Sequence, residues 1–455
     1  MLQVYNTLSK QKELFTPIYG NKINFFVCGP TVYDYPHLGH AKTYTQFDFI
    51  VRYLRYKGYE VFYLQNITDI DDKIIDRAKK LEMPWKDLSI KFEDIYKEDM
   101  TSLGNTSVNE YARATDYIPQ IIQQIKNLYD KGYAYKVEDG IYYEVSKFNE
   151  YGKLSGRTEL KQEDSVSRID EGNAKKGWND FCLWKAKKPD EPFWESDFGA
   201  GRPGWHIEDT AITESYFGPQ YDVHGGAIDL IFPHHECEIA QMEAASGKIP
   251  LVKYWFHTGF LNINAAKMSK STGNFKTVRD ILKIFNYRII RYFILSAHYR
   301  ATIDFSIEGL QQAKSSLERL NNFIFKIDMN LDDVENISYV DEVRSKIIGA
   351  LDNDFNTPDA LAHLFDFIRS QNTKINNGKV VSNLFAELNL IFGDIFNTSD
   401  KAIPEIYIME LIKEREHHRK TKNFKKADEI RDLLKNKHIE LYDSLDGVKW
   451  RVLEQ

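Results

Sequence analysis

Apolar and polar residues follow one another along the chain in blocks that predict strands and helices in turn. A continuous apolar run at residues 23–27 predicts a buried strand, and a second run follows at 61–64. Between them, apolar residues recur at helical spacing over 41–54, with Pro36 where the helix would begin and Gly58 where it would end. Two buried strands joined by a helix form a βαβ unit, so the pattern predicts a parallel sheet.

The parallel-sheet pattern is then interrupted. After two predicted helices, the stretch YAYKVEDGIYYEV reads as a β-hairpin within a polar region that reaches about residue 195. The α/β pattern returns with strands predicted at 221–224 and 254–262 and a helix at 233–245 between them. Two halves of one sheet are therefore expected on either side of an insertion.

The last third of the chain has a different pattern. From about residue 306 the spacing is helical, with one apolar stripe from Leu310 to Phe323. A polar link near 397–404 precedes a last helix whose apolar face runs over 424–434. The tail IELYDSLDGVKW places an Asp-Gly turn between strand-like residues, which predicts a terminal hairpin.

Length, composition and charge narrow the class of protein. A chain of 455 residues is too long for a single core, and two to four domains are expected. Three cysteines form no disulfide framework and suit a reducing compartment, and no signal peptide or membrane-length apolar run is visible, so the cytoplasm is expected. The net charge is −7, but residues 411–437 hold ten Lys/Arg against five Asp/Glu. Such a segment suits either a polyanion or a solvated helix face.

The first candidate site residues lie where the first predicted helix starts. His37 and His40 lie at a helix N-terminus after a buried strand, where free N–H groups and the helix dipole favour a phosphate. Gly39 between them has no side chain, so a nucleotide can approach the backbone closely. Two imidazoles can also donate hydrogen bonds to phosphate oxygens. Taken alone, this HxGH pattern is more often two surface histidines in a loop.

A second candidate lies far along the chain, in the stretch NAAKMSKSTGN after a predicted strand. Lys267 and Lys270, three apart among small residues, suit a mobile loop that closes on a triphosphate. Such a loop is by itself more often only solvated. Together, in this order and within an α/β fold, HxGH and KMSKS are strong evidence for a site that binds a triphosphate.

These elements resemble the class I aminoacyl-tRNA synthetases, and the residues around them narrow the resemblance to the cysteinyl-tRNA synthetase family. The similar blocks follow the order of that family: CGPTVYDYPHLGHAKTY, NITDIDDKI, GRPGWHIE, DVHGGAIDLIFPHHE, KMSKSTGNF, DNDFNTPDAL and KADEIRDLL. The resemblance covers essentially the whole chain.

The resemblance implies an α/β fold in which a Rossmann-type parallel-sheet catalytic domain carries a connective insertion and is followed by a helical bundle and a small anticodon-binding domain. The expected bounds are 1–130 for the first half of the catalytic domain, 131–200 for the insertion, 201–262 for the second half, 263–305 for the KMSKS loop and stem-contact region, 306–396 for the bundle and 397–455 for the C-terminal domain.

The resemblance also implies an activity. The family joins ATP, accompanied by Mg²⁺, to L-cysteine as cysteinyl-adenylate and passes the cysteinyl group to the terminal ribose of tRNA(Cys). His37 and His40 would contact the ATP phosphates, with Gly39 beside them. Lys267 and Lys270 would stabilise charge on the triphosphate as pyrophosphate leaves. A monomer is expected.

Three further positions take their roles from the resemblance. Asp229 would accept hydrogen bonds from the adenosine ribose, although an aspartate there also suits a helix cap. Thr68 and Trp205 would line the amino-acid pocket, and core packing is the plain alternative for Trp205.

A metal site is expected near the second half of the sheet. His234 and Glu238 are four apart, so they share one helix face and could bind zinc, or form a simple i,i+4 pair. In the resembling family these positions join Cys28 and a second cysteine on a zinc ion that takes the substrate thiolate as an added ligand. A soft thiolate prefers zinc far more than a hydroxyl does, which selects cysteine over serine.

The chain departs from the family at the second cysteine, since Asp209-Thr210 stands where many members read Cys-Ser. The leading hypothesis is a zinc ion on Cys28, Asp209, His234 and Glu238, because aspartate carries the same charge as a thiolate. In one alternative, Asp209 orients a ligand of a zinc held by three protein groups and water. In another, Cys237 supplies the missing sulfur, although a helical neighbour points about 100° away from the face of Glu238.

The remaining question is which molecule accepts the cysteinyl group. A ligase for a small amino-sugar acceptor shares the same elements but lacks a tRNA-reading C-terminal domain, and a non-catalytic tRNA-binding paralogue usually loses the catalytic residues that are present here. Four basic residues of the last helices could contact tRNA phosphates: Arg419, Lys422, Lys425 and Lys426. Trp450 could stack on a base or pack in the core of a small domain.

Overall fold

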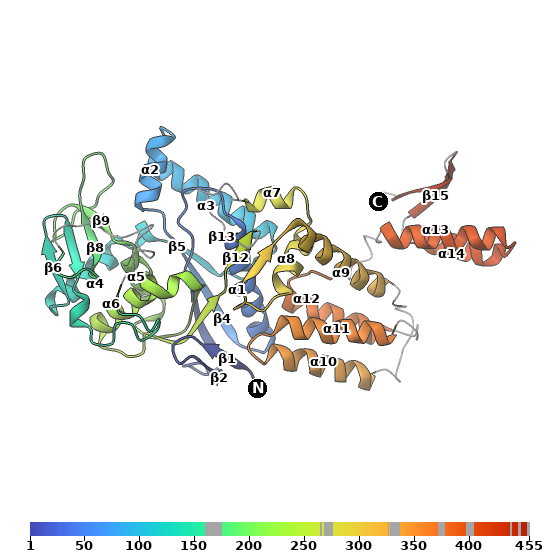
Figure 1. The fold of residues 1–455 in the computed structure, drawn as a ribbon, viewed down its shortest axis with the longest axis horizontal. Helices are drawn as coiled ribbons and strands as arrows, with labels where there is room; N and C mark the ends of the chain where they lie inside the picture. Colours follow the sequence, from blue (N-terminus) through green and yellow to red (C-terminus); the bar gives the residue numbers. More distant parts are fainter. Residues whose placement is uncertain are drawn as a thin grey trace.

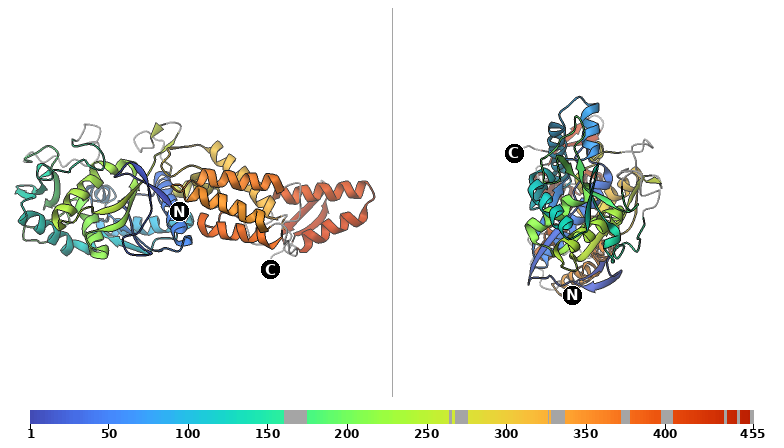
Figure 2. Two further views of the ribbon diagram at one scale, coloured as in Figure 1. Left: turned by 90° about the horizontal axis from the view of Figure 1, so that it is seen from below. Right: turned by 90° about the vertical axis from the view of Figure 1, so that its left-hand side faces the viewer.

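The protein, seen in a computed structural model, is elongated, and its parts follow one another along the long axis (Figure 1). The insertion lies at one end, the parallel sheet and the helical bundle follow, and the C-terminal hairpin of helices lies at the other end, as a second view confirms (Figure 2). The structure describes residues 1–159, 175–263, 266–267, 276–325, 327, 337–371, 378–396, 405–436, 439–444 and 447–452. Lys270 therefore lies outside the described residues, and the side chain of Lys267 is not described.

A five-stranded, fully parallel sheet forms the centre of the α/β part of the chain, in the order β11-β10-β3-β4-β5. Its strands are β3 (Lys22–Val27), β4 (Glu60–Ile67), β5 (Glu110–Arg113), β10 (Tyr221–Ala227) and β11 (Val252–Thr258). The predicted βαβ unit is β3, α1 (Leu38–Tyr56) and β4. Phe25 pairs with Tyr63 on one side and Val223 on the other, and all three side chains are buried. The α/β fold class is confirmed.

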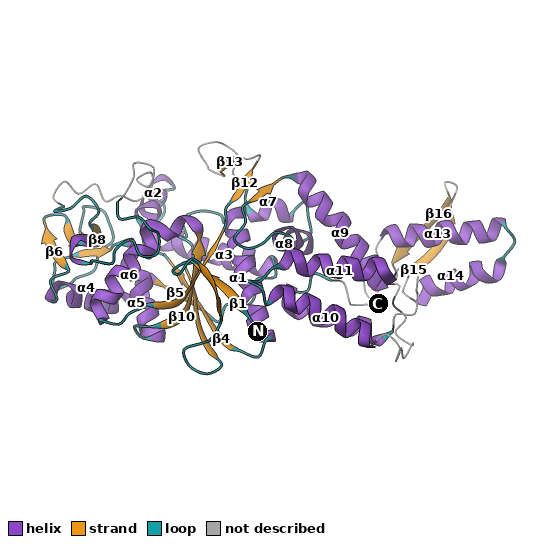
Figure 3. Ribbon diagram, turned by 60° about the horizontal axis from the view of Figure 1, so that its bottom comes forward, coloured by secondary structure: helices purple, strands orange, loops and turns teal. Residues whose placement is uncertain are grey.

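Helices cover the faces of this sheet (Figure 3). Buried residues of α1 and α3 (Trp85–Ser102) share a core with one face, and those of α5 (Trp205–Phe217) and α6 (Glu236–Ser246) share a core with the other. Helix α2 (Asp72–Lys80) packs against α3, and α4 (Ile118–Asp130) packs against α5 and α6. The helix predicted over 233–245 begins later than expected, because a π-helical turn occupies Ile231–His235 and Phe232 in it has an extended backbone. His234 therefore precedes the regular helix.

The strand predicted over 254–262 is divided at Gly259. Strand β11 ends at Thr258, and β12 (Leu261–Ile263) joins a different sheet with β13 (Ala266–Lys267) and β14 (Ile303–Phe305). A Cβ atom on Gly259 would lie 2.4 Å from the carbonyl oxygen of Ala301, so only glycine fits this crossing of two backbone segments.

The insertion folds as a four-stranded antiparallel sheet in the order β6-β7-β8-β9. Its strands are β6 (Ala134–Val137), β7 (Gly140–Tyr143), β8 (Phe181–Ala186) and β9 (Gly201–Pro203). The predicted hairpin is β6 and β7. A second, N-terminal hairpin of β1 (Gln3–Asn6) and β2 (Gln11–Leu14) was not predicted, because β2 has no buried residue to give it an apolar pattern.

The helical bundle follows the sheet and shares one hydrophobic core with it. Its helices are α7 (Val278–Leu282), α8 (Tyr287–Leu295), α9 (Ile307–Phe325), α10 (Ile337–Leu351), α11 (Thr357–Gln371) and α12 (Lys379–Phe392). The predicted stripe of α9 from Leu310 to Phe323 is buried in that core.

The C-terminal domain has its own small core. It consists of α13 (Glu405–Lys420), α14 (Phe424–Asn436) and the predicted terminal hairpin of β15 (Ile439–Ser444) and β16 (Gly447–Val452). Ala427, Ile430 and Leu434 form the apolar face expected of α14, whereas Phe424 is 61% exposed and does not belong to it. Among the described helices of the protein, none is both long enough and apolar enough to cross a membrane.

Candidate active site and metal centre

A cavity of about 350 Å³ opens where the central parallel strands end. Cys28 and Gly29 follow β3, Asn66 lies near the end of β4 and Ala227 ends β10, so the cavity is at the carboxyl ends of the sheet, where α/β proteins bind ligands. Several of the predicted site residues line it: Cys28, His37, Gly39, His40, Trp205, Asp209, Asp229 and His234.

The two histidines of HxGH cap helix α1 through the Nδ1 atoms of their rings. His37 Nδ1 accepts hydrogen bonds from the backbone N–H groups of Gly39 (3.0 Å) and His40 (3.3 Å), and His37 N–H donates to His40 Nδ1 (3.3 Å). The rings stack with their centroids 3.8 Å apart. A neutral imidazole whose Nδ1 accepts carries its proton on Nε2, so the cap fixes Nε2 as the donor in both rings.

This capping corrects one expectation. The first N–H groups of α1 were expected to be free for a phosphate, but Leu38 N–H donates to the carbonyl of Lys276 and the next two donate to His37. The backbone donors are therefore already used within the protein. Donors for an anion in this part of the cavity come from the imidazoles instead.

The segment that leaves the KMSKS stretch lies directly beside these histidines. His37 and Thr277 form an antiparallel bridge, and Val278 N–H donates to the carbonyl of Pro36 (3.0 Å). Residues 276–278, which follow the KMSKS stretch in the sequence, therefore lie beside HxGH at the cavity.

Four buried side chains bring together the donor atoms of the predicted metal site. Ligand atoms of Cys28, Asp209, His234 and Glu238 all lie within 4.8 Å of one another. His234 Nε2 is 3.1 Å from Asp209 Oδ2 and 3.1 Å from Glu238 Oε1. Sulfur, imidazole nitrogen and carboxylate oxygen are all zinc ligands, so the donor set fits this metal chemically.

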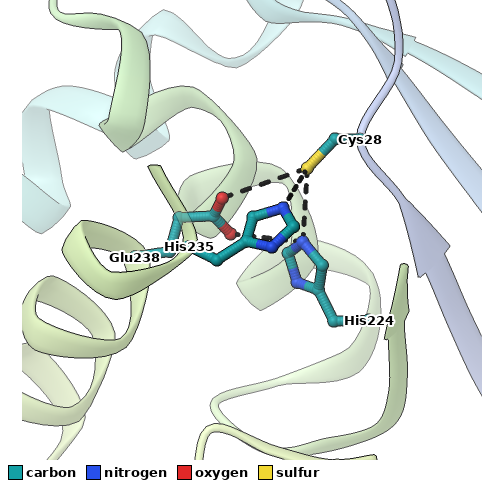
Figure 4. Close-up of side chains that lie close together, drawn as sticks. All are labelled: Cys28, His224, His235 and Glu238. Atoms are coloured by element: carbon teal, nitrogen blue, oxygen red, sulfur yellow. Dashed lines mark hydrogen bonds and ion pairs between the residues drawn. The ribbon is translucent and has the colours of Figure 1, made fainter. Parts of the chain in front are cut away.

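A second group of donors shares two of these residues. Cys28 Sγ lies 3.3 Å from His224 Nε2 and 3.1 Å from His235 Nε2, and Glu238 completes the group (Figure 4). The far nitrogens of both rings are engaged, His224 Nδ1 with the Tyr221 hydroxyl and His235 Nδ1 with His257 Nε2. The sequence did not predict this group, although both histidines stand in the block DVHGGAIDLIFPHHE.

The cavity distinguishes the two groups. Cys28, Asp209 and His234 line it, whereas His224 and His235 are not among its described lining residues. A cation held by the first group would therefore lie at the wall of the cavity. Burial, together with the charge of Asp209, holds the pKa values of the Cys28 thiol and the Glu238 carboxyl well above their usual ranges. These two groups therefore favour their protonated forms on their own, and a bound cation would stabilise their charged forms.

Asn66 links Asp209 to the backbone next to Cys28, and the sequence did not predict this role. Its Nδ2 donates to Asp209 Oδ1 (2.6 Å), and its Oδ1 accepts from the N–H of Gly29, the residue after Cys28. One carboxylate oxygen of Asp209 is thereby fixed, while the other faces His234. The only signal in the sequence was the position of Asn66 in the block NITDIDDKI.

Of the two residues predicted to line the amino-acid pocket, Trp205 and Thr68, only Trp205 lines the described cavity. Trp205 lines the cavity and stacks on His234, with ring centroids 3.9 Å apart and an interplanar angle of 11°. Thr68 is buried, donates to Glu208 (3.0 Å) and is not among the described residues that line the cavity. Cys237 lies outside both donor groups, against the hydroxyl of Tyr151 at 3.4 Å, which removes the support for its alternative role as a ligand.

Known proteins similar to this chain match it over nearly its whole length. Residues 14–315 match the family described as tRNA synthetases class I (C) catalytic domain, and residues 346–397 match the DALR domain. The cysteine–tRNA ligase of Thermococcus gammatolerans is 45% identical over 99% of this chain and 99% of its own, and that of Clostridioides difficile is 44% identical over 99% and 100%. The chain belongs to the cysteine–tRNA ligase family. The family and the enzyme class predicted from the sequence are confirmed.

Solved structures of more distant synthetases share the fold. The Mycobacterium tuberculosis methionyl-tRNA synthetase in complex with methionyl-adenylate superposes with a TM-score of 0.59 over 83% of this chain and 89% of its own, at 15% identity. A leucyl-tRNA synthetase ternary complex from Agrobacterium radiobacter gives 0.61 over 82% and 83%, at 11% identity. The cysteine–tRNA ligase fold described above is thus the common class I frame.

The C-terminal domain of this cysteine–tRNA ligase family member carries the predicted basic residues on its surface. Arg419, Lys422, Lys425 and Lys426 lie at the end of α13, in the turn and at the start of α14, and all are exposed. Trp450 is half-buried and packs against the core of the domain. Core packing, the plain alternative, therefore accounts for part of that side chain.

Proposed function

We propose that the protein ligates L-cysteine to tRNA(Cys) through cysteinyl-adenylate, and that a zinc ion on Cys28, Asp209, His234 and Glu238 recognises the substrate. One observation carries the proposal: the buried donor group forms part of the wall of the same cavity as His37 and His40. An amino-acid thiol and a nucleotide can therefore meet within one site.

In the first step, a carboxylate oxygen of cysteine attacks the α-phosphorus of ATP, and the bond from that phosphorus to the β-bridging oxygen breaks. Pyrophosphate leaves, accompanied by Mg²⁺. The Nε2–H groups of His37 and His40 would donate to phosphate oxygens as charge builds on them. Lys267 and Lys270, in the loop whose exit segment lies beside His37, would stabilise the leaving pyrophosphate.

In the second step, a hydroxyl of the terminal tRNA ribose attacks the carbonyl carbon of the adenylate and AMP leaves. Asp229, exposed on the cavity wall, would accept hydrogen bonds from the adenosine ribose. Trp205, stacked on His234, would close the wall around the cysteine side chain. Thr68 would act from behind this wall, through its bond to Glu208.

The donor set also gives the proposed specificity a physical basis. When bound, zinc would supply a soft Lewis acid that prefers the thiolate of cysteine to the hydroxyl of serine. Asn66 would hold Asp209 so that its Oδ2 faces the donor group. Cys28 would then supply the one protein sulfur in a group otherwise made of oxygen and nitrogen donors.

Two assays on the purified protein test the proposal. Pyrophosphate–ATP exchange should depend on cysteine and not respond to serine, and metal analysis should find a single zinc ion per chain. Exchange without cysteine dependence, or full activity in zinc-free protein, would contradict it.

The acceptor needs its own assay. Transfer of labelled cysteine to tRNA(Cys), with none to an amino-sugar acceptor, is expected, because the DALR match and the exposed basic residues of α13 and α14 suit tRNA. Transfer only to the amino sugar would favour the small-acceptor ligase. Binding of tRNA without any exchange would favour a non-catalytic paralogue.

A further inference from the structure

Lys42 on helix α1 is a buried lysine whose partners are all uncharged. Its side chain is 1% exposed. The ammonium donates to the side-chain oxygen of Gln46 (2.9 Å) and to the backbone carbonyls of Gly259 (2.7 Å) and Tyr299 (3.1 Å). Burial lowers the pKa of Lys42 to about 7.

Such a position is unfavourable unless the ammonium has a specific task. Removing an ammonium from water costs several kcal/mol, and neutral oxygens offset that cost less well than a carboxylate does. An apolar side chain would fill the space without this cost. What an ammonium adds is three donors on one atom, and here each donor has an acceptor.

The two carbonyls belong to segments that close a junction around Lys42. Gly259 N–H donates to the carbonyl of Tyr299 (2.9 Å), so that carbonyl accepts from both Gly259 and Lys42. The hydroxyls of Thr43 and Thr258 lie 3.0 Å apart next to this junction. Helix α1, the end of β11 and the turn after α8 are therefore held at one point.

This junction forms the base of one wall of the cavity. Gly259, Phe260 and Leu261 line the cavity, as do His40 and Thr43 on α1. The same backbone continues through β12 into β13, which contains Lys267. The position of this turn relative to α1 therefore affects the part of the cavity that is lined by Gly259–Leu261 together with His40 and Thr43. The metal-donor residues come from other segments: after β3, on α5, in the turn before α6 and on α6.

We propose that Lys42 is a positioning residue for ATP, whose ammonium holds the Gly259–Leu261 wall of the cavity against helix α1. The inference rests on the proposed function and deepens it for the nucleotide half of the site. It separates ATP from cysteine, because cysteine is expected at the metal-donor half.

The decisive measurement compares the two substrates in variants of Lys42. In Lys42→Met, which keeps the length of the stem but none of the donors, kcat/KM for ATP should fall about 10- to 100-fold, because small displacements of a site wall have effects of this size. The KM for cysteine should change less than about twofold. Lys42→Arg keeps charged donors and should recover part of the loss for ATP.

Lys131→Met is the control. Lys131 is exposed and also donates to two backbone carbonyls, those of Ala244 and Ala245 at the end of α6, but these acceptors, unlike Gly259, are not among the described residues that line the cavity. Lys131→Met should leave both KM values unchanged. Equal losses for ATP and cysteine in Lys42→Met, or no loss for either, would overturn the proposal.

Two further measurements keep the test decisive. If Lys42→Met does not fold, Lys42→Gln takes its place with the same expected split between the substrates. The rise in melting temperature on adding ATP should be smaller in the variant than in the wild type, and this measurement needs no catalysis. If wild-type protein shows no exchange, the proposed function fails, and an unchanged ATP-induced shift in Lys42→Met would then overturn the role of Lys42 separately.

Discussion

Two buried clusters of charged side chains balance their charges in opposite ways. One lies between α1 and α8 and is called the junction below, and the other lies at the cavity. At the junction, Asp48 of α1 is 2% exposed and Arg291 of α8 is fully buried, and the two form an ion pair. Arg52 donates to the same carboxylate (2.7 Å), and the backbone N–H groups of Thr106 and Ser107 donate to its other oxygen. The junction contains its own counter-charges.

The contacts described for the acidic groups of the cavity cluster instead include those with imidazoles and with the Asn66 amide. Cys28, Asp209 and Glu238 are crowded together with histidines that burial keeps neutral, since the pKa of His224 and of His235 is well below the usual range. Burial raises the pKa of Asp48 as well, but Arg291 and Arg52 outweigh it, so that pKa is lowered, whereas the pKa values of Cys28 and Glu238 are raised.

The difference teaches how a buried polar cluster can be interpreted. A cluster that brings its own cations is complete and holds helices together, here α1, α8 and the end of α12 through the bond from Arg291 to the carbonyl of Phe392. A cluster in which burial and a neighbouring acid raise the pKa values of its acidic groups would gain stability in its charged form from a cation supplied from outside. Each prediction below tests one side of this contrast.

The largest effect is expected at the junction. Arg291→Met leaves Asp48 buried without its main partner and should reduce the free energy of unfolding by about 3–5 kcal/mol, measured by denaturant unfolding. Lys346→Met, at an exposed lysine of α10, is the control and should change it by less than about 0.5 kcal/mol. A small loss in Arg291→Met would mean that the junction does not depend on its ion pair.

The same junction has a defined pH dependence. Because the pKa of Asp48 is lower in the folded protein than in the unfolded chain, its contribution is fully present above the unfolded value and is lost as the pH falls through the folded value. Arg291→Met should therefore flatten the acid limb of the stability–pH curve, and unfolding between about pH 5 and pH 2 measures this.

The cavity cluster should respond in metal binding and not in folding. Cys28→Ser replaces the one sulfur donor, so zinc content should fall and kcat/KM for cysteine should drop by more than about 100-fold. Cys237→Ser is the matched control, because that thiol is also buried but lies against Tyr151, and it should retain zinc. Loss of zinc in both variants would revive Cys237 as a ligand.

The position that departs from the family allows a finer test. Asp209→Ala should weaken zinc binding by about 10- to 100-fold, and Asp209→Cys should bind zinc more tightly than the wild type, because sulfur donates more electron density than oxygen. Competition with a chromophoric chelator measures both. Unchanged zinc affinity in Asp209→Ala would show that Asp209 does not bind the metal.

Asn66 should produce a smaller effect of the same kind. Asn66→Ala removes the donor that holds Asp209 Oδ1 and should weaken zinc binding by about tenfold, as is typical of groups that orient a ligand. If Asp209 is a ligand, the loss from Asn66→Ala should disappear in an Asp209→Ala background. Additive losses would mean that Asn66 acts through Cys28 and Gly29 instead.

Much of the fold was predictable because apolar periodicity reports burial directly. The runs at 23–27 and 61–64 became neighbouring strands, and the stripe of α9 is buried. The break at Gly259 was not predictable, since the residue that requires a glycine, Ala301, is remote in sequence. The π-helical turn before α6 was missed because apolar spacing does not distinguish it from a regular turn.

The site was predictable to the extent that the resemblance carried its residues. Cys28, Asp209, His234 and Glu238 were named from matching positions, and the structure brings them together. The bond from Asn66 to Asp209 and the junction of Lys42 with Gly259 and Tyr299 join residues from separate segments. Spacing along the chain carries no information on such contacts, so only the folded structure supplied them.

The smallest effect is expected for charges that neither cluster contains, the exposed lysines of the C-terminal domain. Lys425→Ala should leave stability within about 0.5 kcal/mol, because Lys425 is exposed at the start of α14. If it contacts a tRNA phosphate, the slope of log affinity against log salt concentration should fall by roughly one counterion, measured by filter binding at several salt concentrations. Lys346→Ala on α10 should leave the slope unchanged. An unchanged slope in Lys425→Ala as well would mean that Lys425 is only solvated and does not contact the tRNA backbone.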